Sequence, residues 1–365
     1  MDDIGLFYSA QHKSAGTHLA LPWGGRVRFI VPRHNTARQA CWGTFHLGRL
    51  EYFLRAITWL PRYFGAVCCV EDERLELIRE TIGNDAGISC CRSGATGPWS
   101  KDTILFLHKK TVAPLCIVKA GAGDAVDLLL RNEANWLRTL QRQASLVDHI
   151  PELVAHQSGA YLSFVAELLL PGVIDFEFWD PHVSFLRKFQ QHSRQTMRIE
   201  ESRFYRNMRS RLKDLSGLLS NAWSNRLDTG MRQIEQSLSG APILLVAAHN
   251  DFTPWNIRIE HGFARVFDWE NADYEHLPLF DPLHFALMPM ALKSRATAPM
   301  VRCIMQTLKK SQQWLGKEFC YNAQTQVLAY LMSICTLYLW SVRGASESHP
   351  VLDSYSRIID HLCLP

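Results

Sequence analysis

The sequence predicts an α+β protein in which a five-strand β sheet with one helix precedes a largely helical region. Two observations support this class. Residues 86–170 alternate short apolar runs with turns and contain one long amphipathic stretch, whereas helical periodicity dominates the chain after residue 171. Two further apolar runs, at 243–248 and 257–269, predict a small β insertion of two strands within the helical part.

The composition is that of an ordinary globular protein. The 365 residues are 47% hydrophobic and 20% charged, which is enough apolar material for at least one full core and argues against general disorder. The formal charge of +4 is too small to indicate a nucleic-acid partner. The ten cysteines form no CxxC pair and have no histidine at zinc-ligand spacing, so buried thiols in a reducing, cytoplasmic compartment are favoured over a metal or disulfide framework.

Two stretches bear on membrane association. The start, "MDDIGLFYSAQHK", is acidic where a signal peptide is basic, and no long apolar run comes after it. Residues 319–342 contain no charged residue, which fits either a membrane span or a buried helix. Polar side chains interrupt this stretch, and its solid apolar part is shorter than the roughly 20 residues that a bilayer requires. A buried helix and a chain without a transmembrane segment are therefore predicted.

Three segments divide the chain. Residues 1–85 form an N-terminal extension with a helix that ends before Pro61 and a strand after it, and we expect this extension to pack on the remainder of the protein. Residues 86–170 hold the sheet and its helix. Residues 171–365 hold the helical region with the β insertion.

The elements of the second segment come in a clear order. Turn residues separate three strands within 88–121, and two further strands lie within 152–170. Between these groups, apolar residues recur at helical spacing over 124–143. Asp124 stands where it would cap the first turn of that helix.

Short oxygen-bearing side chains gather between the two strands of the β insertion. Asp251 and Asn256 lie on one turn broken by Pro254, and Asp268 comes after the apolar part of the second strand. An aspartate in a turn is, by itself, more often a cap or an Asx-turn residue. Together, however, one amide and one or two carboxylate oxygens suit a hard cation such as Mg²⁺, which shares its shell with substrate phosphates. The pattern therefore points to phosphoryl transfer.

The motif "HNDFTPWNI", with "VFDWE" after it, resembles the catalytic and metal loops of the aminoglycoside-phosphotransferase and choline-kinase branch of the protein-kinase-like fold. By this resemblance Asp251 is the catalytic base, and Asn256 and Asp268 bind the metal. His249 matches the residue that braces the catalytic loop, by hydrogen bonding rather than by proton transfer. Glu270 matches an acidic residue that is common at this place in the branch, and is either a further metal ligand or a solvated carboxylate. The implied fold is two-lobed, with a small antiparallel-sheet N-lobe that contains one helix and a mainly helical C-lobe.

The sheet region offers the nucleotide-binding features that the resemblance requires. In a kinase-like N-lobe, a strand lysine paired with a helix glutamate holds the α and β phosphates of the nucleotide. Lys119 in "CIVKAG" and Glu133 in "RNEANWL" match these residues, so we expect an ion pair between them. The stretch "FVAELLLPG" resembles the hinge between the lobes, where backbone groups around Glu167 and Leu169 would bind adenine.

Two positions depart from the family pattern, and a third agrees with it. Asn250 replaces the usual glycine before the base, which is expected to alter the geometry of the loop. The turn "SGATGPWS" has only Gly94 and Gly97 and does not match GxGxxG, so a phosphate cradle and an ordinary hairpin turn are equally open. Asp281 in "PLFDPLHFA" resembles a downstream aspartate that steadies the catalytic region, and a structural role is expected for it.

The resemblance implies a phosphotransferase that uses ATP and Mg²⁺ and acts on a hydroxyl group of a small molecule. Thr253 stands where protein kinases of the Ser/Thr type place a lysine. Only thirteen residues lead from Asp268 to Asp281, which leaves little room for a peptide-binding activation segment. Both features disfavour a protein substrate.

The stretch 184–240 is predicted to be mainly helical and falls where this family builds its acceptor pocket. Its arginines suit an anionic acceptor such as a sugar acid or a phosphorylated sugar, although a charge run of this kind is also typical of a solvated helix face. They are Arg187, Arg194, Arg198, Arg203, Arg206, Arg209 and Arg211. A looser resemblance to phosphotransferase-like proteins of bacterial glycan loci makes a sugar or glycan-precursor kinase the leading hypothesis. The alternatives are an aminoglycoside-type antibiotic kinase and a pseudokinase or nucleotide-binding scaffold.

Overall fold

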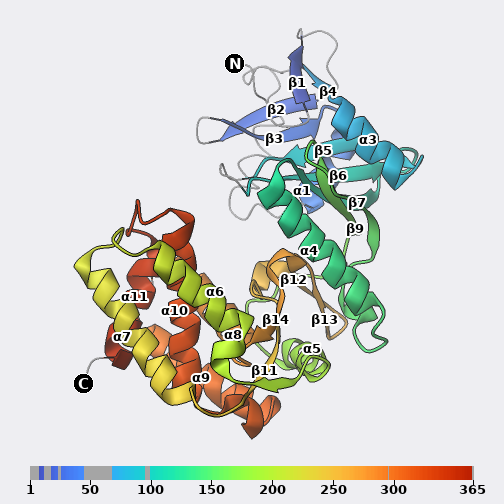
Figure 1. The fold of residues 1–365 in the computed structure, drawn as a ribbon. Helices are drawn as coiled ribbons and strands as arrows, with labels where there is room; N and C mark the ends of the chain where they lie inside the picture. Colours follow the sequence, from blue (N-terminus) through green and yellow to red (C-terminus); the bar gives the residue numbers. More distant parts are fainter. Residues whose placement is uncertain are drawn as a thin grey trace. The chain divides into compact units, whose positions relative to one another are not determined.

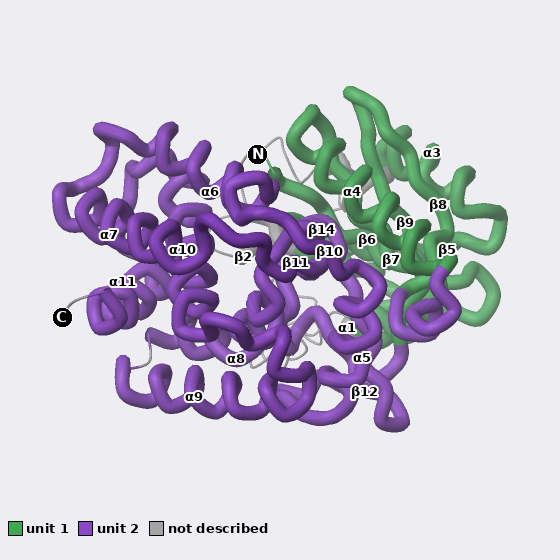
Figure 2. Tube along the Cα trace, turned by 60° about the horizontal axis from the view of Figure 1, so that its bottom comes forward, with its two compact units in different colours: residues 1–142, 151–170 green, residues 143–150, 171–365 purple. Residues whose placement is uncertain are grey.

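The chain forms two compact units (Figure 1, Figure 2). The computed structural model describes residues 8–11, 18–23, 26–44, 68–94, 99–294 and 296–363. Unit 1 comprises residues 1–142 and 151–170, and unit 2 comprises residues 143–150 and 171–365. Most of the helix predicted before Pro61 lies outside the described residues.

Unit 1 is built on an antiparallel sheet of seven strands in the order β2-β3-β5-β6-β7-β9-β8. Its strands are β2 (His18–Trp23), β3 (Arg26–Pro32), β5 (Ala86–Arg92), β6 (Asp102–His108), β7 (Pro114–Gly121), β8 (Leu153–Gln157) and β9 (Ser163–Leu168). The five strands predicted after residue 86 are all present. Side chains alternate between the two faces of a strand, and on β7 Cys116, Val118 and Ala120 are buried on one face. Lys119 therefore emerges on the other face.

Strands of the N-terminal extension continue this sheet. β3 pairs with β5, with Phe29 opposite Arg92 and Ile30 opposite Cys91, and β2 pairs with β3. The extension also contains α1 (Asn35–Thr44), α3 (Glu73–Ile82) and a separate pair, β1 (Tyr8–Gln11) with β4 (Cys68–Glu71). Ile30 and Leu75 belong to the same buried cluster as the apolar residues of β6 and β7. Apart from the β1–β4 pair, the described strands and helices of the extension thus share this sheet and its core instead of forming a layer of their own.

The helix of unit 1, α4 (Asp124–Gln141), packs against β7, β8 and β9. Its apolar face buries Val126 and Leu130, and Glu133 lies on this same buried face. The prediction that Asp124 caps the helix is wrong. The N-cap is Gly123, at φ 92°, without a side-chain cap hydrogen bond, and Asp124 is the first helical residue. A glycine takes this backbone conformation without the strain that a side chain would cause.

Unit 2 is mainly helical and contains two small sheets. Its helices are α5 (Asp180–Gln191), α6 (Arg203–Asp214), α7 (Asn221–Leu238), α8 (Phe280–Ala291), α9 (Thr297–Trp314), α10 (Ala323–Ser341) and α11 (Pro350–Cys363). One sheet has the order β10-β11-β14 (Gln195–Met197, Ile243–Ala248, Asp273–His276), and the other pairs β12 (Ile257–Glu260) with β13 (Phe263–Val266). Single-turn helices are η1 (Val147–His149), η2 (Ile199–Glu201), η3 (Pro254–Asn256), η4 (Trp269–Asn271) and η5 (Lys317–Cys320).

The β insertion differs from its prediction in one respect. The single strand predicted over 257–269 is in fact a hairpin, because the chain turns back at His261 and Gly262. Both residues adopt positive φ, 48° and 79°. Two consecutive residues of this kind form the tight turn that joins antiparallel strands. The reversal brings the end of β13, and the residues after it, back to the loop before β12.

The uncharged stretch 319–342 forms η5 and α10, and α10 is buried in the core of unit 2. Val327, Leu331 and Leu339 are at most 1% exposed and belong to the large apolar cluster of that unit. α10 packs against α6, α7, α8 and α11. The prediction of a buried helix is confirmed. Within the described part of the chain, none of the helices combines the length and the apolarity needed to cross a bilayer.

Candidate active site

The loop between β11 and β12, residues 249–256, is fixed by buried aromatic side chains. Phe252 is fully buried and stacks on Phe185 of α5, with ring centroids 5.9 Å apart. Trp269, the first residue of η4, is also fully buried, and its ring lies 4.6 Å from that of His249. Because protein interiors are close-packed, these side chains hold the loop and the segment after β13 in place, and the polar residues between them gain defined positions.

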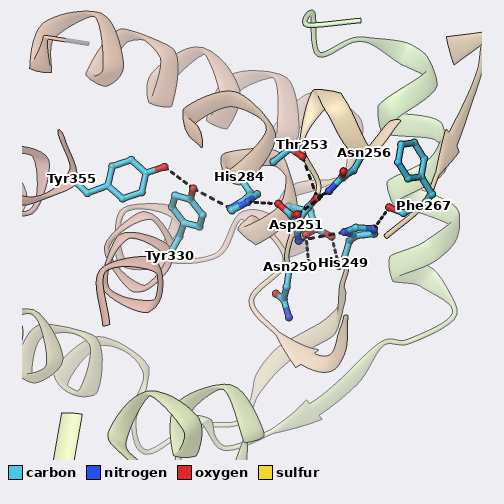
Figure 3. Close-up of polar contacts among 10 residues, drawn as sticks. His249, Asn250, Asp251, Thr253, Asn256, Phe267, His284, Tyr330 and Tyr355 are labelled. Atoms are coloured by element: carbon cyan, nitrogen blue, oxygen red, sulfur yellow. Dashed lines mark hydrogen bonds and ion pairs between the residues drawn. The ribbon is translucent and has the colours of Figure 1, made fainter. Parts of the chain in front are cut away.

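The carboxylate of Asp251 is held at both of its oxygens (Figure 3). Oδ2 accepts a hydrogen bond from Asn256 Nδ2 at 2.8 Å, and Oδ1 accepts one from His284 Nε2 at 3.2 Å. Asn256 Nδ2 also donates to the main-chain carbonyl of Asp251, at 3.0 Å. Hydrogen bonds to an ionised group are stronger than neutral ones. The carboxylate is therefore well oriented, and its side chain remains 31% exposed and accessible.

The imidazole of His249 links this loop to the chain after β13. Its Nε2 donates to the Phe267 carbonyl at 3.0 Å, and its Nδ1 accepts the backbone N–H of Asp251 at 3.3 Å. A neutral imidazole has one donor and one acceptor nitrogen, so the two bonds define the tautomer with its proton on Nε2. With both nitrogens bonded to the backbone, His249 is arranged to hold the loop.

Asp281 of α8 binds the backbone of the loop. Its Oδ2 accepts the N–H of His249 at 2.8 Å and its Oδ1 accepts that of Asn250 at 3.1 Å. The side chain is fully buried, and burial raises the pKa of this carboxyl to about 6 in spite of the two backbone hydrogen bonds. Asn250 has φ 64°, in the left-handed region that asparagine tolerates better than most residues. It therefore adopts a conformation that is otherwise typical of glycine, and its Nδ2 donates to the Asn271 carbonyl at 2.9 Å.

His284 is a residue of this site that the sequence analysis did not identify. Its Nδ1 lies 3.3 Å from the hydroxyl of Tyr330, which lies 2.8 Å from that of Tyr355 (Figure 3). Because Nε2 donates to Asp251, Nδ1 accepts from Tyr330. Burial raises the pKa of both tyrosines, so they stay neutral. One signal was present in the sequence: His284 lies three residues after Asp281 and thus on the same face of α8.

Oxygen donors from two neighbouring segments suit a metal ion. Because Asn256 turns its Nδ2 to Asp251, its Oδ1 faces away, and no described residue donates a hydrogen bond to that oxygen. The N–H of Phe267 donates to the Asn256 carbonyl at 3.1 Å, and Asp268 comes directly after it, at φ 73°. Glu270 lies in η4 and is partly exposed. Amide and carboxylate oxygens, without sulfur, are the donor set that fits Mg²⁺.

In unit 1, Lys119 and Glu133 form the ion pair expected of them. Lys119 Nζ lies 2.5 Å from Glu133 Oε1, and the two side chains are 12% and 0% exposed. An unpaired charge in such a buried position would cost several kcal/mol. The pair therefore explains how a lysine is accommodated on an interior strand.

Three other residues assigned to the nucleotide, Glu167, Leu169 and Gly94, lie on, next to or between the strands of unit 1. Glu167 is buried in β9, and Leu169 lies just past the end of that strand and is partly buried. Gly94 lies in the connection between the antiparallel strands β5 and β6, where a Cβ atom would lie 2.1 Å from the Lys101 carbonyl oxygen. Close packing of the hairpin alone thus requires a glycine at this position. Gly97 lies outside the described residues.

A cavity of about 380 Å³ opens beside Asp251 within unit 2. Aromatic side chains form part of its wall, and polar side chains face it from α6, the loop and β14. The residues that line the cavity include Phe204, Asn207, Arg211, Asn250, Asp251, Trp255, Asn271, Asp273, His276, Phe280, His284 and Tyr338. Of the arginines predicted to meet an acceptor, Arg211 is the one among these lining residues. The volume is in the range of small-molecule sites.

Comparison with solved structures identifies the fold. Aminoglycoside phosphotransferase APH(4)-Ia, as a thermostable mutant in a ternary complex with ADP and hygromycin B, matches with a TM-score of 0.52 at 12% identity, over 80% of this chain and 98% of that one. The apo form of a thermostable mutant of the same enzyme matches with a TM-score of 0.51 at 10% identity, over 74% and 94%. No protein-family model and no curated protein sequence matches the chain. The resemblance carried by the motifs is confirmed at the level of the fold: the chain has the protein-kinase-like fold of the aminoglycoside phosphotransferases.

Proposed function

We propose that the protein is a phosphotransferase that moves the γ-phosphoryl group of ATP to a hydroxyl group of a small molecule. One observation carries the proposal: the Asp251 carboxylate is oriented by Asn256 and His284 and lines a cavity of small-molecule size. A carboxylate held in this way can orient an acceptor hydroxyl and take its proton. The fold, shared with an enzyme solved with ADP and hygromycin B, supports this class of reaction.

Residues of both units have parts in the proposed mechanism. Asp251 accepts the proton of the acceptor hydroxyl, and general-base assistance of this kind contributes roughly 10²–10⁴-fold. Lys119, positioned by Glu133, binds the nucleotide phosphates, and Glu167 and Leu169 offer backbone groups to adenine. Asn256 Oδ1 and Asp268, with Glu270 nearby, would hold Mg²⁺, which supplies positive charge to the transferring phosphoryl group.

The segment after the metal aspartate supports a small acceptor. Residues 268–281 are folded into η4 and β14, and β14 pairs with β11 through His276 opposite Val246. This segment is part of a sheet and leaves little room for the peptide-binding activation segment of a protein kinase. We therefore propose a small acceptor, with a sugar or glycan precursor as the leading class.

The experiment measures ADP release with and without Mg²⁺ across a panel of sugars, sugar phosphates, amino alcohols and aminoglycosides. Mass spectrometry then detects the phosphorylated product. We expect Mg²⁺-dependent turnover with at least one acceptor, and loss of turnover in Asp251→Asn with nucleotide binding retained. If nucleotide raises the melting temperature while no acceptor is phosphorylated by the wild type, the protein is a nucleotide-binding scaffold and the proposal is wrong.

A further inference from the structure

One wall of the cavity carries an arginine without a carboxylate partner. Arg211 of α6 lines the cavity, and its guanidinium lies 5.8 Å from the ring centroid of Trp340. Arg211 forms no ion pair among the described residues, and the nearby carboxylate of Asp214, three residues further along α6, accepts a hydrogen bond from Trp340 Nε1 at 3.0 Å. Burial lowers the pKa of the Arg211 guanidinium, which is the effect of taking a cation out of water. Arg211 is partly buried, and a partly desolvated cation without a counter-ion is costly, so its place in a cavity wall favours an anionic ligand.

A histidine in the same wall has an unsatisfied nitrogen. His276 is only 7% exposed, and its ring packs between those of Phe204 and Phe280, with centroids 4.8 Å and 4.6 Å away. Its Nδ1 is buried and has no hydrogen-bond partner among the described residues. Burial, with a smaller contribution from the nearby Arg211, lowers the pKa of His276 to about 3, so the ring is neutral. Buried polar atoms are nearly always hydrogen-bonded, so this nitrogen is an unsatisfied polar atom in a residue that lines the cavity.

The carboxylates of the cavity wall bind other residues and form no ion pair with Arg211. Asp273 forms an ion pair with Arg203 at 3.3 Å, and Asp251 is bound by Asn256 and His284. The neighbouring arginine of α6, Arg209, points elsewhere and pairs with Glu235 at 3.6 Å. Arg211 is thus the charged side chain of this wall that forms no ion pair among the described residues.

We propose that Arg211 and His276 form an anion subsite, and that the acceptor carries a carboxylate or phosphate group that binds there while its hydroxyl faces Asp251. This inference rests on the proposed phosphotransferase function and narrows its acceptor. An oxyanion accepts hydrogen bonds from a guanidinium and from an imidazole N–H at once, which satisfies both side chains. A polycation would place positive charge against Arg211, so an aminoglycoside is the wrong kind of acceptor for this cavity.

The test measures binding by calorimetry to the wild-type chain and to four variants, of which Asp251→Asn is one. The probes are glucose, glucose 6-phosphate, glucuronate, inorganic phosphate and hygromycin B. Arg211→Gln removes the cation and His276→Phe removes the imidazole nitrogens while keeping a ring between its neighbours. Arg209→Gln is the matched control, because Arg209 lies on the same helix and does not line the cavity. Circular dichroism and melting curves establish that each variant is folded.

The anionic probes should bind to the wild type more tightly than glucose, and whichever of glucose 6-phosphate and glucuronate binds better identifies the anion. Because hydrogen bonds to charged groups contribute about 1.5–3 kcal/mol, Arg211→Gln should weaken that probe roughly 10- to 150-fold. His276→Phe should weaken it about fivefold, and Arg209→Gln should leave it unchanged. Equal binding of glucose and the anions by the wild type, or tighter binding of hygromycin B, would overturn the inference without any variant.

The acceptor assay separates this inference from the proposed function. If anions bind through Arg211 but neither they nor any other acceptor is phosphorylated, the phosphotransferase proposal fails and the subsite stands. If a neutral or cationic acceptor is phosphorylated equally well by wild type and Arg211→Gln, the function stands and the subsite is wrong. Asp251→Asn should keep the affinity for the anion and lose only turnover.

Discussion

Removal of the hydrogen bond from His284 to Asp251 should lower kcat and leave the affinity for ATP nearly unchanged. His284→Phe removes the donor to Oδ1 and keeps an apolar ring at a buried position, while Asn256 still holds Oδ2. A hydrogen bond to a charged group contributes about 1.5–3 kcal/mol, so kcat should fall roughly 10- to 150-fold. The KM for ATP should stay within about twofold, because the lost bond orients the acceptor side of the reaction.

The assay is steady-state ADP release with an acceptor identified from the panel, with kcat and KM measured separately. His284→Gln supplies an amide donor and should recover part of the loss, which a purely structural role would not explain. Tyr330→Phe removes only the bond to Nδ1, so its effect should be smaller, about fivefold or less. Full kcat in a folded His284→Phe variant would refute the reasoning. Equal losses in the phenylalanine and glutamine variants, together with a lowered melting temperature, would also count against it.

The other predictions concern charge, pH and packing. Glu133→Gln leaves the Lys119 ammonium without its carboxylate and should lower the free energy of unfolding by about 3–5 kcal/mol, measured by chemical denaturation. The Asp281 carboxyl has a folded pKa of about 6 against an ordinary 3.8, so the folded chain binds a proton between these values. Relative to Asp281→Asn, the free energy of unfolding of the wild type should therefore rise as the pH falls through this window. The wild-type kcat should fall below about pH 6, because protonation removes a carboxylate acceptor from the loop. A wild-type kcat that stays constant down to pH 5 would contradict this. Gly230→Ala places a Cβ 2.6 Å from the buried Met332 Sδ and should lower the melting temperature, because overpacking costs about 1–3 kcal/mol and a helical alanine gains about 1.

The sequence was informative where chemistry and local pattern coincide. Lys119 and Glu133 were predictable as a pair because the family resemblance assigns both residues, and because a charge on an interior strand requires a partner. The loop motif likewise predicted that Asp251 and Asn256 would lie together, since five positions on a turn broken by proline bring side chains close. These inferences depend on residues that lie close together along the chain or on a motif, and both can be recognised in the amino-acid sequence alone.

The cavity beside Asp251 could not be predicted in this way, because its wall comes from segments that no local pattern connects. Arg211 on α6 is one of many arginines in a charged stretch, and only the fold shows that it lines the cavity while Arg209 pairs with a glutamate. His276 ends β14, where its neighbours Phe204 and Phe280 come from two other elements. The same limit applies to the continuation of the sheet by β3, since strand partners are set by tertiary contacts and not by the composition of a strand.

The loop 249–256 and the segment 267–271 are joined into a single element, which explains why Asn250 can replace a glycine. Three hydrogen bonds join the loops: Phe267 N–H to the Asn256 carbonyl, His249 Nε2 to the Phe267 carbonyl, and Asn250 Nδ2 to the Asn271 carbonyl. A glycine would supply the left-handed backbone but not the third bond. Asparagine supplies both, because it tolerates positive φ and carries an amide donor. The side chain that departs from the family pattern thus ties the proposed base to the proposed metal ligands, so a change in either loop should be felt in the other.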